Sequence, residues 1–246
     1  MHFLKSWGIL KTLFFGMQDT IAQNIENLKR RVAETCKRVG RDVASVRIVA
    51  VSKMFGIDKI EEARVAGLED FGENYVQELR EKIELWTGKP VRWHFIGHLQ
   101  SNKVKYIIDS IHLLHSLDSL RLAKEVQKRA QKPVDVLLEV HTTEEATKTG
   151  VRPDEVVELA RQVSHLDKVR IRGLMTMGPF SDNPEDSRSS FRLLAELRRS
   201  IERERIPGVA MEDLSMGMTH DYEIAIEEGA TILRIGTAIF GKRRPG

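Results

Sequence analysis

The stretch VRIVAVSKMFG (residues 46–56) is an apolar run that ends in a lysine, Lys53. Its β-branched residues and short length predict a buried strand. Lysine is rarely buried without a partner or a task. Either Lys53 marks the point where the strand reaches the surface, or it is held there to do chemistry. Strand periodicity alone leaves both interpretations open.

Seven further apolar runs of similar length follow along the chain, separated by segments with helical periodicity. Strands that alternate with helices pair in parallel through right-handed crossovers. The sequence therefore predicts a parallel sheet. The seven runs are LEDFGENY (68–75), VRWHFIG (91–97), IHLLHSLD (111–118), VDVLLEVH (134–141), VRIRGLMTMG (169–178), VAMEDLSMG (209–217) and ILRIGTAIFG (232–241).

Eight strand and helix units in roughly 230 residues match the size of a (β/α)8 barrel. An open, doubly wound sheet is the rival α/β fold. The count of eight favours closure, and so does an extra amphipathic helix, TIAQNIENLKRRVAETCKRVG (20–40), which precedes the first strand. That helix could complete the outer ring. We predict a single (β/α)8 TIM barrel with an extra N-terminal helix.

Composition points to a soluble globular protein without a nucleic-acid partner. The chain has 246 residues, and 39 basic residues are nearly balanced by 36 acidic ones, for a formal charge of +3. The basic residues are scattered rather than clustered, whereas a bound polyanion needs a basic patch. Cys36 is the single cysteine and cannot form an intramolecular disulfide, so we expect a reducing cytoplasm.

The segment MHFLKSWGILKTLFFG (1–16) is apolar, but Lys5 and Lys11 interrupt it. It is too short to span a bilayer and lacks a clear small-residue cleavage site. We interpret residues 1–16 as an N-terminal extension that a misplaced start codon would explain, with a signal or membrane anchor as the alternative. Residues 17–246 form the predicted domain.

Polar residues gather at the carboxyl ends of the predicted strands, where barrel enzymes build their active sites. A structural protein would have no need for so many polar groups on one rim. These residues are Lys53, Glu73, Asn74, Tyr75, His98, Gln100, Asn102, Ser116, Asp118, His141, Thr176, Ser215, Gly217, Thr219, Gly236 and Thr237.

The last two strands end in SMGMT (215–219) and RIGTA (234–238), which combine glycines with hydroxyls. Glycine lets backbone amides approach an anion, and hydroxyls donate to phosphate oxygens. Gly217 and Gly236 could instead merely permit bends. Barrels often bind phosphate with the loops after strands seven and eight. The same composition in both loops therefore favours a phosphate.

Arg234 lies within the last apolar run, and a buried guanidinium needs an acceptor. Its partner is either a glutamate, such as Glu139 or Glu212, or an electronegative atom of a ligand. A lysine at one strand end and a phosphate cradle at another suggest a phosphorylated carbonyl compound captured as a Schiff base, which requires a neutral amine. Pyridoxal phosphate has the aldehyde and the phosphate on one ring; a phosphosugar is the alternative.

Seven motifs in order, VAVSK, FGENYVQEL, WHFIGHLQSNK, SLDSLRLA, RGLMTMGPF, LSMGMTHDYEIAIEEGAT and LRIGTAIFG, closely resemble the pyridoxal phosphate homeostasis proteins (the YggS/PROSC-type family) from about Met17 to Lys242. The resemblance implies a barrel similar to the N-terminal barrel of alanine racemase. It also implies that Lys53 is the Schiff-base lysine and that Arg234 faces the pyridine nitrogen. The residues expected around the rest of the cofactor are Asn74, Ser215, Gly217, Thr219, Gly236 and Thr237.

The resemblance implies a carrier and regulator of the cofactor rather than an enzyme, with cofactor-dependent apoenzymes as possible partners; we expect a monomer. A racemase or decarboxylase acting through Lys53 is the alternative. A racemase needs a second acid or base opposite Lys53, and only Tyr75 or Tyr222 could substitute for the tyrosine that racemases take from a further domain. We expect no metal, because His94 and His98 do not share a helical face.

Overall fold

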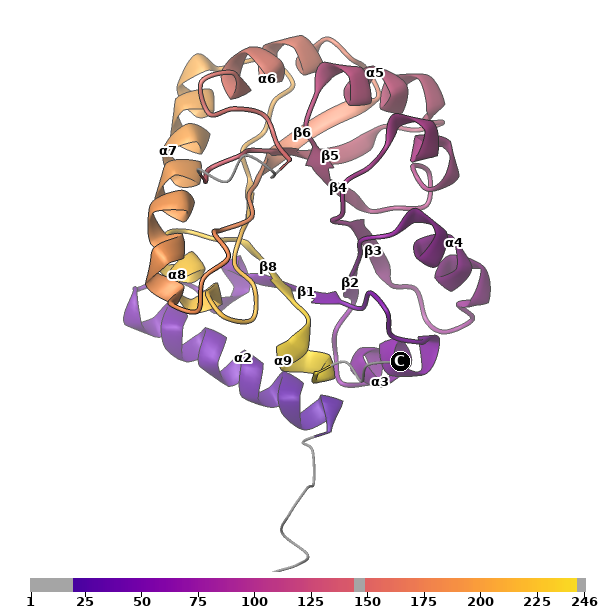
Figure 1. The fold of residues 1–246 in the computed structure, drawn as a ribbon, viewed down its shortest axis with the longest axis vertical. Coiled ribbons are helices and arrows are strands. Elements are labelled where there is room, and N and C mark those ends of the chain that lie inside the picture. Colours follow the sequence, from indigo (N-terminus) through magenta and orange to yellow (C-terminus); the bar gives the residue numbers. More distant parts are fainter. Residues whose placement is uncertain (1–19, 144–148, 243–246) are drawn as a thin grey trace, which may run out of the picture.

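The strands of the computed structural model, which describes residues 20–143 and 149–242, form a closed barrel (Figure 1). All eight strands run parallel, each pairs with its successor, and β8 pairs with β1. The prediction of a barrel is confirmed, and each predicted run contains one strand. The predicted extension at 1–16 lies outside the described residues. The strands are β1 (Arg47–Val51), β2 (Asp70–Glu73), β3 (Arg92–Phe95), β4 (Leu113–Leu117), β5 (Val134–Glu139), β6 (Val169–Met175), β7 (Asp213–Ser215) and β8 (Ile232–Ile235).

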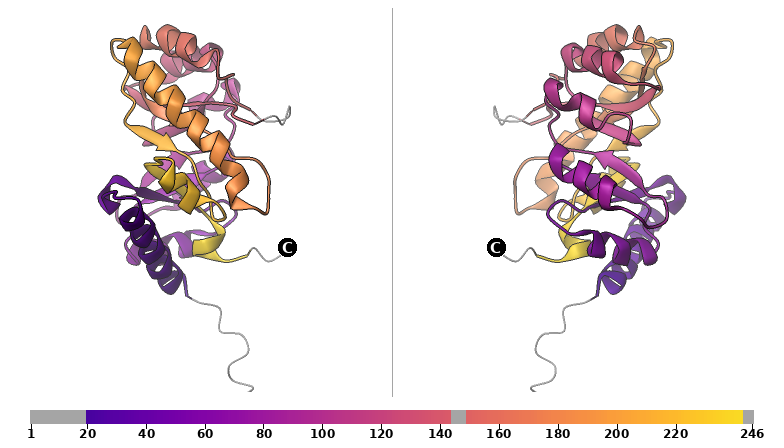
Figure 2. Two further views of the ribbon diagram at one scale, coloured as in Figure 1. Left: turned by 90° about the vertical axis from the view of Figure 1, so that its left-hand side faces the viewer. Right: turned by 90° about the vertical axis from the view of Figure 1, so that its right-hand side faces the viewer.

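Helices surround the ring of strands, as the side views in Figure 2 show. The Asn183 side chain caps the short η3 helix by accepting from Glu185 N. The α-helices are α2 (Ile21–Arg38), α3 (Ile57–Val65), α4 (Val76–Leu85), α5 (Leu120–Arg129), α6 (Val156–Ser164), α7 (Arg188–Glu204), α8 (Tyr222–Glu227) and α9 (Thr237–Phe240), and the 3₁₀ helices are η1 (Val43–Ser45), η2 (Ser101–Tyr106) and η3 (Pro184–Ser187).

The extra helix α2 joins the outer ring, as predicted. It begins with a capping box in which Thr20 and Gln23 exchange hydrogen bonds. Its apolar stripe is buried against the barrel, and Asn24 Nδ2 donates to Ile239 O of α9 at 2.9 Å. Helix α2 therefore connects the start of the domain to the helix that follows the last strand.

Side chains alternate between the inside and the outside of the barrel. Val49, Leu113, Leu137, Met175 and Ile232 form an apolar cluster of their own inside the barrel, and the outward-facing residues pack against the helices. Because Val49 faces inward, the strand period directs residue 53 of the same segment toward the mouth. This is the end of the barrel at which all strands present their carboxyl termini.

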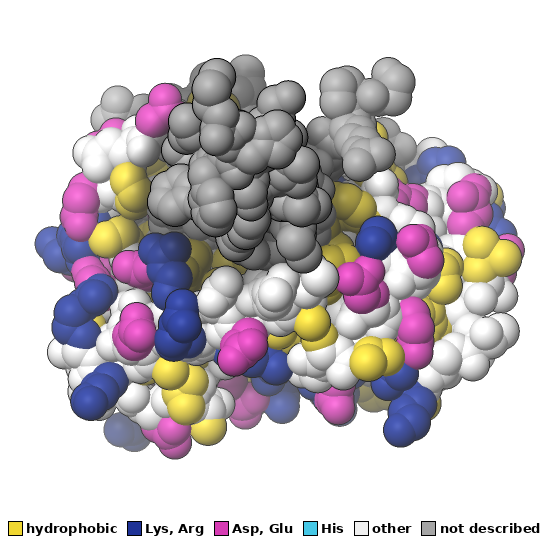
Figure 3. Space-filling view, turned by 90° about the horizontal axis from the view of Figure 1, so that it is seen from below, with side chains coloured by type: hydrophobic (Ala, Val, Ile, Leu, Met, Phe, Trp, Pro, Cys, Tyr) yellow, Lys and Arg dark blue, Asp and Glu magenta, His cyan; other side chains and the backbone are white. Residues whose placement is uncertain are grey.

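The outer surface mixes charges of both signs. Figure 3 shows Lys and Arg interspersed with Asp and Glu on the face below the view of Figure 1. Among the described residues, no helix is long and apolar enough to cross a membrane. Within the same ranges, no group of three His, Cys, Asp or Glu side chains could hold a metal ion.

Candidate functional site

The turn that carries Lys53 leaves β1 and is held from outside the barrel. Ser52 Oγ donates to Glu73 Oε1 at 2.6 Å, and Met54 N donates to Glu78 Oε1 at 2.5 Å. Met54 has a φ of 66°, which is uncommon for a residue other than glycine. Hydrogen bonds on both sides of Lys53 therefore stabilise an unusual backbone conformation at this position.

Lys82 of α4 joins these groups into one buried cluster. Its Nζ donates to Ser52 O at 2.8 Å and to Glu73 Oε1 and Glu78 Oε1 at 2.7 Å each. The Glu73 side chain is fully buried, and burial raises the pKa of its carboxyl while Lys82 opposes that rise. We call Ser52, Glu73, Glu78 and Lys82 the outer clamp. Sequence reasoning missed Lys82, because a helical lysine ordinarily indicates a solvated face.

The loops after β7 and β8 meet at the mouth. Gly217 has a φ of +88°, and a Cβ there would lie 2.5 Å from the Cβ of Ala225, so only glycine fits. Arg234 N donates to Gly217 O at 3.0 Å, and Ala238 N donates to Thr219 Oγ1 at 3.3 Å. The two predicted phosphate-binding loops thus contact each other through backbone and hydroxyl groups.

Gly236 and Thr237 stand beside the end of β1. The register pairs Ala50 with Ile235, and a Cβ on Gly236 would lie 3.5 Å from Val51. Gly236 is the N-cap residue of α9. The segment that carries Lys53 and the loop after β8 therefore leave neighbouring strands at the same end of the barrel.

Arg234 lies beneath these loops and is only 3% exposed. Its Nη1 donates to Ser215 Oγ and its Nη2 to Thr176 O, both at 2.7 Å. Burial lowers the pKa of Arg234 to about 10, against the opposing charges of Asp221 and Glu139. These contacts fix the plane of the guanidinium.

Of the two alternatives for the partner of Arg234, an internal ion pair with a glutamate is not found among the described residues. Glu212 instead pairs with Arg172 at 3.1 Å. Glu139 Oε1 accepts from Thr149 Oγ1 at 2.6 Å, and its Oε2 is buried without a hydrogen-bond partner in the described part of the chain. Neutral oxygens hold Arg234, and its charge is not cancelled by direct contact.

A chain of hydrogen bonds continues from Arg234 through the barrel. Ser215 Oγ contacts His115 Nδ1, His115 Nε2 contacts His94 Nδ1, and His94 Nε2 contacts Asp70 Oδ1, each at 2.9 Å. All of these residues are buried. We call Asp70, His94, His115, Ser215 and Arg234 the interior chain. Sequence reasoning did not identify His115 or connect it with His94.

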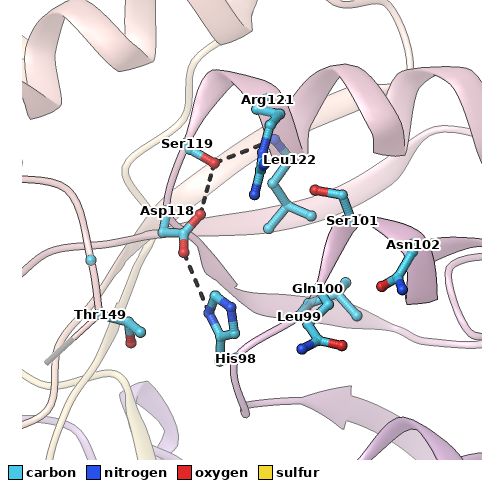
Figure 4. Close-up of a pocket in the computed structure, with 11 residues that line it drawn as sticks. His98, Leu99, Gln100, Ser101, Asn102, Asp118, Ser119, Arg121, Leu122 and Thr149 are labelled. Atoms are coloured by element: carbon cyan, nitrogen blue, oxygen red, sulfur yellow. Dashed lines mark hydrogen bonds and ion pairs between the residues drawn. The ribbon is translucent and has the colours of Figure 1, made fainter. Parts of the chain in front are cut away.

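The opposite side of the mouth holds a cavity of about 850 Å³ between η2 and α5 (Figure 4). His98 Nδ1 lies 3.5 Å from Asp118 Oδ2, and Ser119 Oγ donates to Asp118 Oδ1 at 2.9 Å. Gln100 and Asn102 from the predicted rim also line this cavity. The rim therefore has a glycine and hydroxyl side, formed by β1, β7 and β8, and a side of titratable groups.

Two observations indicate that the mouth suits a small polar ligand. Asn74 Oδ1 is buried and has no hydrogen-bond partner among the described residues. A buried polar atom without a partner is costly, so it is the kind of atom that a ligand completes. The narrow backbone of Gly217 and the hydroxyl of Thr219 fit a phosphate, and Lys53 fits a carbonyl carbon. The residues present thus fit pyridoxal phosphate.

Tyr222 does not face the mouth. Its side chain is buried on the outside of the barrel, where the guanidinium of Arg31 of α2 lies 5.7 Å from the centre of its ring. Tyr75 is the N-cap residue of α4 and is 57% exposed. Tyr222 is therefore directed away from the position that a racemase acid or base would need.

The chain matches the family model "Alanine racemase, N-terminal domain" over residues 18–244. It is 45% identical to the pyridoxal phosphate homeostasis protein of Aquifex aeolicus, over 90% of this chain and 98% of that one. The pyridoxal phosphate homeostasis protein of Pseudomonas aeruginosa is 39% identical over 92% of this chain and 97% of its own. The chain belongs to this family.

Solved structures agree with membership of the pyridoxal phosphate homeostasis family. PipY of Synechococcus elongatus, with pyridoxal phosphate bound, is 30% identical, has a TM-score of 0.78, and matches 90% of this chain and 100% of its own. Alanine racemase of Corynebacterium glutamicum has a TM-score of 0.68 at 13% identity, over 90% of this chain and 60% of its own. The second likeness shows a shared fold alone.

Proposed function

We propose that this chain binds pyridoxal phosphate as a Schiff base on Lys53 and acts as an intracellular carrier and regulator of that cofactor. The observation that supports this most is the meeting of three segments at the mouth: the Lys53 turn, the loop of Gly217 and Thr219, and the start of α9 at Gly236. When bound, the cofactor supplies an aldehyde that condenses with a neutral lysine amine and releases one water.

The remaining proposed contacts follow from position. Gly217, Thr219, Gly236 and Thr237 would hold the phosphate, and Arg234 would face the pyridine nitrogen. Asn74 Oδ1 would gain the partner that it lacks. The hydroxyl of Ser215 contacts His115 and Arg234, and its phosphate contact stays a prediction. Cofactor-dependent apoenzymes would receive the cofactor from a monomeric carrier.

The carrier interpretation is favoured over a racemase for a physical reason. A cation beside the pyridine nitrogen opposes its protonation and weakens the ring as an electron sink. Racemisation also needs a second acid or base opposite Lys53, and Tyr222 faces Arg31 of α2 instead.

The test is a titration of purified protein with pyridoxal phosphate, followed by borohydride reduction and peptide mass spectrometry. We expect a visible absorption band and a covalent adduct on Lys53, both lost in Lys53→Ala. Lys59→Ala, which changes an exposed lysine that pairs with Glu62, is the matched control and should keep both. Absence of the band in the wild-type protein would refute the proposal. Robust Lys53-dependent amino acid racemisation would replace the carrier role by an enzymatic one.

A further inference from the structure

The interior chain has one direction of donation, which the charges at its far end determine. Burial opposes the ionisation of Asp70, but hydrogen bonds from Arg92 and His94 outweigh burial and hold the pKa of this carboxyl below its ordinary value. Asp70 is therefore an acceptor, and His94 donates Nε2–H to it. Burial lowers the pKa of both His94 and His115, so each ring is neutral, with one donor and one acceptor nitrogen.

The other links follow from that first donation. His94 accepts at Nδ1, so His115 donates its Nε2–H and accepts at its own Nδ1 from the Ser215 hydroxyl. The hydroxyl proton of Ser215 is then donated to His115, and the Ser215 oxygen accepts from Arg234 Nη1. Every hydrogen bond between members of the interior chain is therefore donated away from the mouth and toward Asp70.

The interior chain crosses the barrel from one end to the other. Asp70 is the first residue of β2, and with Arg92 it lines a cavity of about 370 Å³ at the amino ends of the strands. Arg234 is the third residue of β8, and its backbone N–H bonds to the loop at the mouth. Asp70 is therefore at the opposite end of the barrel from a ligand in the mouth.

We propose that Asp70, His94 and His115 are positioning residues that orient the guanidinium of Arg234 toward the ring nitrogen of the bound cofactor. This inference rests on the proposed function. His94, His115 and Ser215 are neutral groups in series that polarise one another, and each fixes the donor direction of the next. Removing one link leaves Ser215 free to rotate its hydroxyl, and Arg234 then loses one of the acceptors that fix its plane.

The experiment measures the dissociation constant for pyridoxal phosphate and the wavelength of the visible band in Asp70→Asn and His115→Gln. We expect the dissociation constant to rise about five- to tenfold in each. The band should shift in the same direction as in Arg234→Lys. In the Arg234→Lys background, Asp70→Asn should change the dissociation constant by less than about twofold, because the two residues act through one path.

Two matched controls separate this path from general disturbance. Asp135 lies at the amino end of β5 and pairs with Arg170 of the next strand at 2.7 Å, much as Asp70 pairs with Arg92, but it has no link to the interior chain among the described residues. His165 is exposed at the C-cap of α6. Asp135→Asn and His165→Gln should leave affinity and wavelength unchanged.

Each outcome decides between the two proposals. If the wild-type protein binds and the Asp70 and His115 variants match it, the positioning role is overturned while the proposed function stands. If the wild-type protein shows no Lys53-dependent band, the proposed function itself fails. Should a variant not fold, ¹⁵N-histidine NMR of the wild-type apoprotein gives the answer. Neutral Nε2–H tautomers at both His94 and His115 support the chain, and a cationic or Nδ1–H ring at either overturns it.

Discussion

The outer clamp and the interior chain each support one residue at the mouth of the barrel, but by different electrostatics. The outer clamp holds the Lys53 turn with full charges, one ammonium between the carboxylates of Glu73 and Glu78. The interior chain holds Arg234 with neutral imidazoles and a hydroxyl. The outer clamp depends on keeping both signs of charge, whereas the neutral links of the interior chain depend on the tautomer of each histidine. The two clusters should therefore fail under different perturbations.

The largest expected effect is that of Lys82→Met in the outer clamp. The substitution leaves Glu73 buried without its cation, and breaking a buried pair costs about 3–5 kcal/mol of unfolding free energy. Urea denaturation at pH 7 measures the loss. Adding Glu73→Gln should recover part of it, because the uncompensated charge is removed.

Lys59→Met is the matched control, since it breaks an exposed lysine–glutamate pair on the neighbouring helix α3. Its unfolding midpoint should stay that of the wild-type protein. An equal loss in both lysine variants would mean that the outer clamp contributes no more than a surface ion pair.

The interior chain should respond to pH. Burial lowers the pKa of His115 well below its ordinary value, so the folded state keeps this ring neutral while the unfolded chain takes up a proton below about pH 6.5. The unfolded state then binds more protons. The free energy of unfolding therefore decreases as the pH is lowered, by up to about 1.4 kcal/mol per pH unit for each such histidine. Between pH 6.5 and 5, His115 should account for a loss of about 2 kcal/mol of unfolding free energy.

Unfolding free energies measured over this pH range in the wild-type protein and in His115→Gln test the sign and the size. The variant should show the shallower slope. Equal slopes would indicate that His115 is already protonated or exposed in the folded protein, which would break the contrast with the charged clamp.

The smallest expected effect compares two buried serines, one in each cluster. Ser52→Ala removes one donor to Glu73, which keeps Lys82, and should cost about 1 kcal/mol. Ser215→Ala leaves both His115 Nδ1 and Arg234 Nη1 without this partner and should cost about 2 kcal/mol. Thermal unfolding of the two apoproteins measures the difference; a larger loss in Ser52→Ala would reverse the expected ranking.

The fold could be predicted from the sequence because the signal is local and repeated. Each strand is a short apolar run, and alternation with helices predicts parallel pairing. The count of eight runs, together with the extra N-terminal helix, then favoured a closed barrel over an open sheet. The position of Lys53 followed from the end of its run. The meeting of the loops that carry Thr219 and Gly236 followed from the rule that adjacent parallel strands end on the same side.

The two supporting clusters could not be predicted, because they depend on register and on contacts between distant elements. Strand alternation predicts that His94 and His115 face the inside of the barrel, but not that they lie at the same level along the barrel axis. The pairing of β3 with β4 fixes that height, and β4 also has an irregularity in its pairing with β5 between Leu114 and Leu117. Lys82 lies on a helix, and nothing local indicates that its ammonium ends beneath Ser52.

The pairing of the last strand with the first has a consequence for synthesis on the ribosome. Until β8 emerges, a nascent chain has at most seven strands and an open edge on β1, so neither Arg234 nor the start of α9 is in place at the mouth. Helix α2 is synthesised first, but its Asn24 side chain has no Ile239 O to donate to until α9 has emerged. A chain that lacks β8 therefore carries the proposed Schiff-base lysine without Arg234 and the loop after β8, so the proposed selection of a phosphorylated aldehyde would require the last strand.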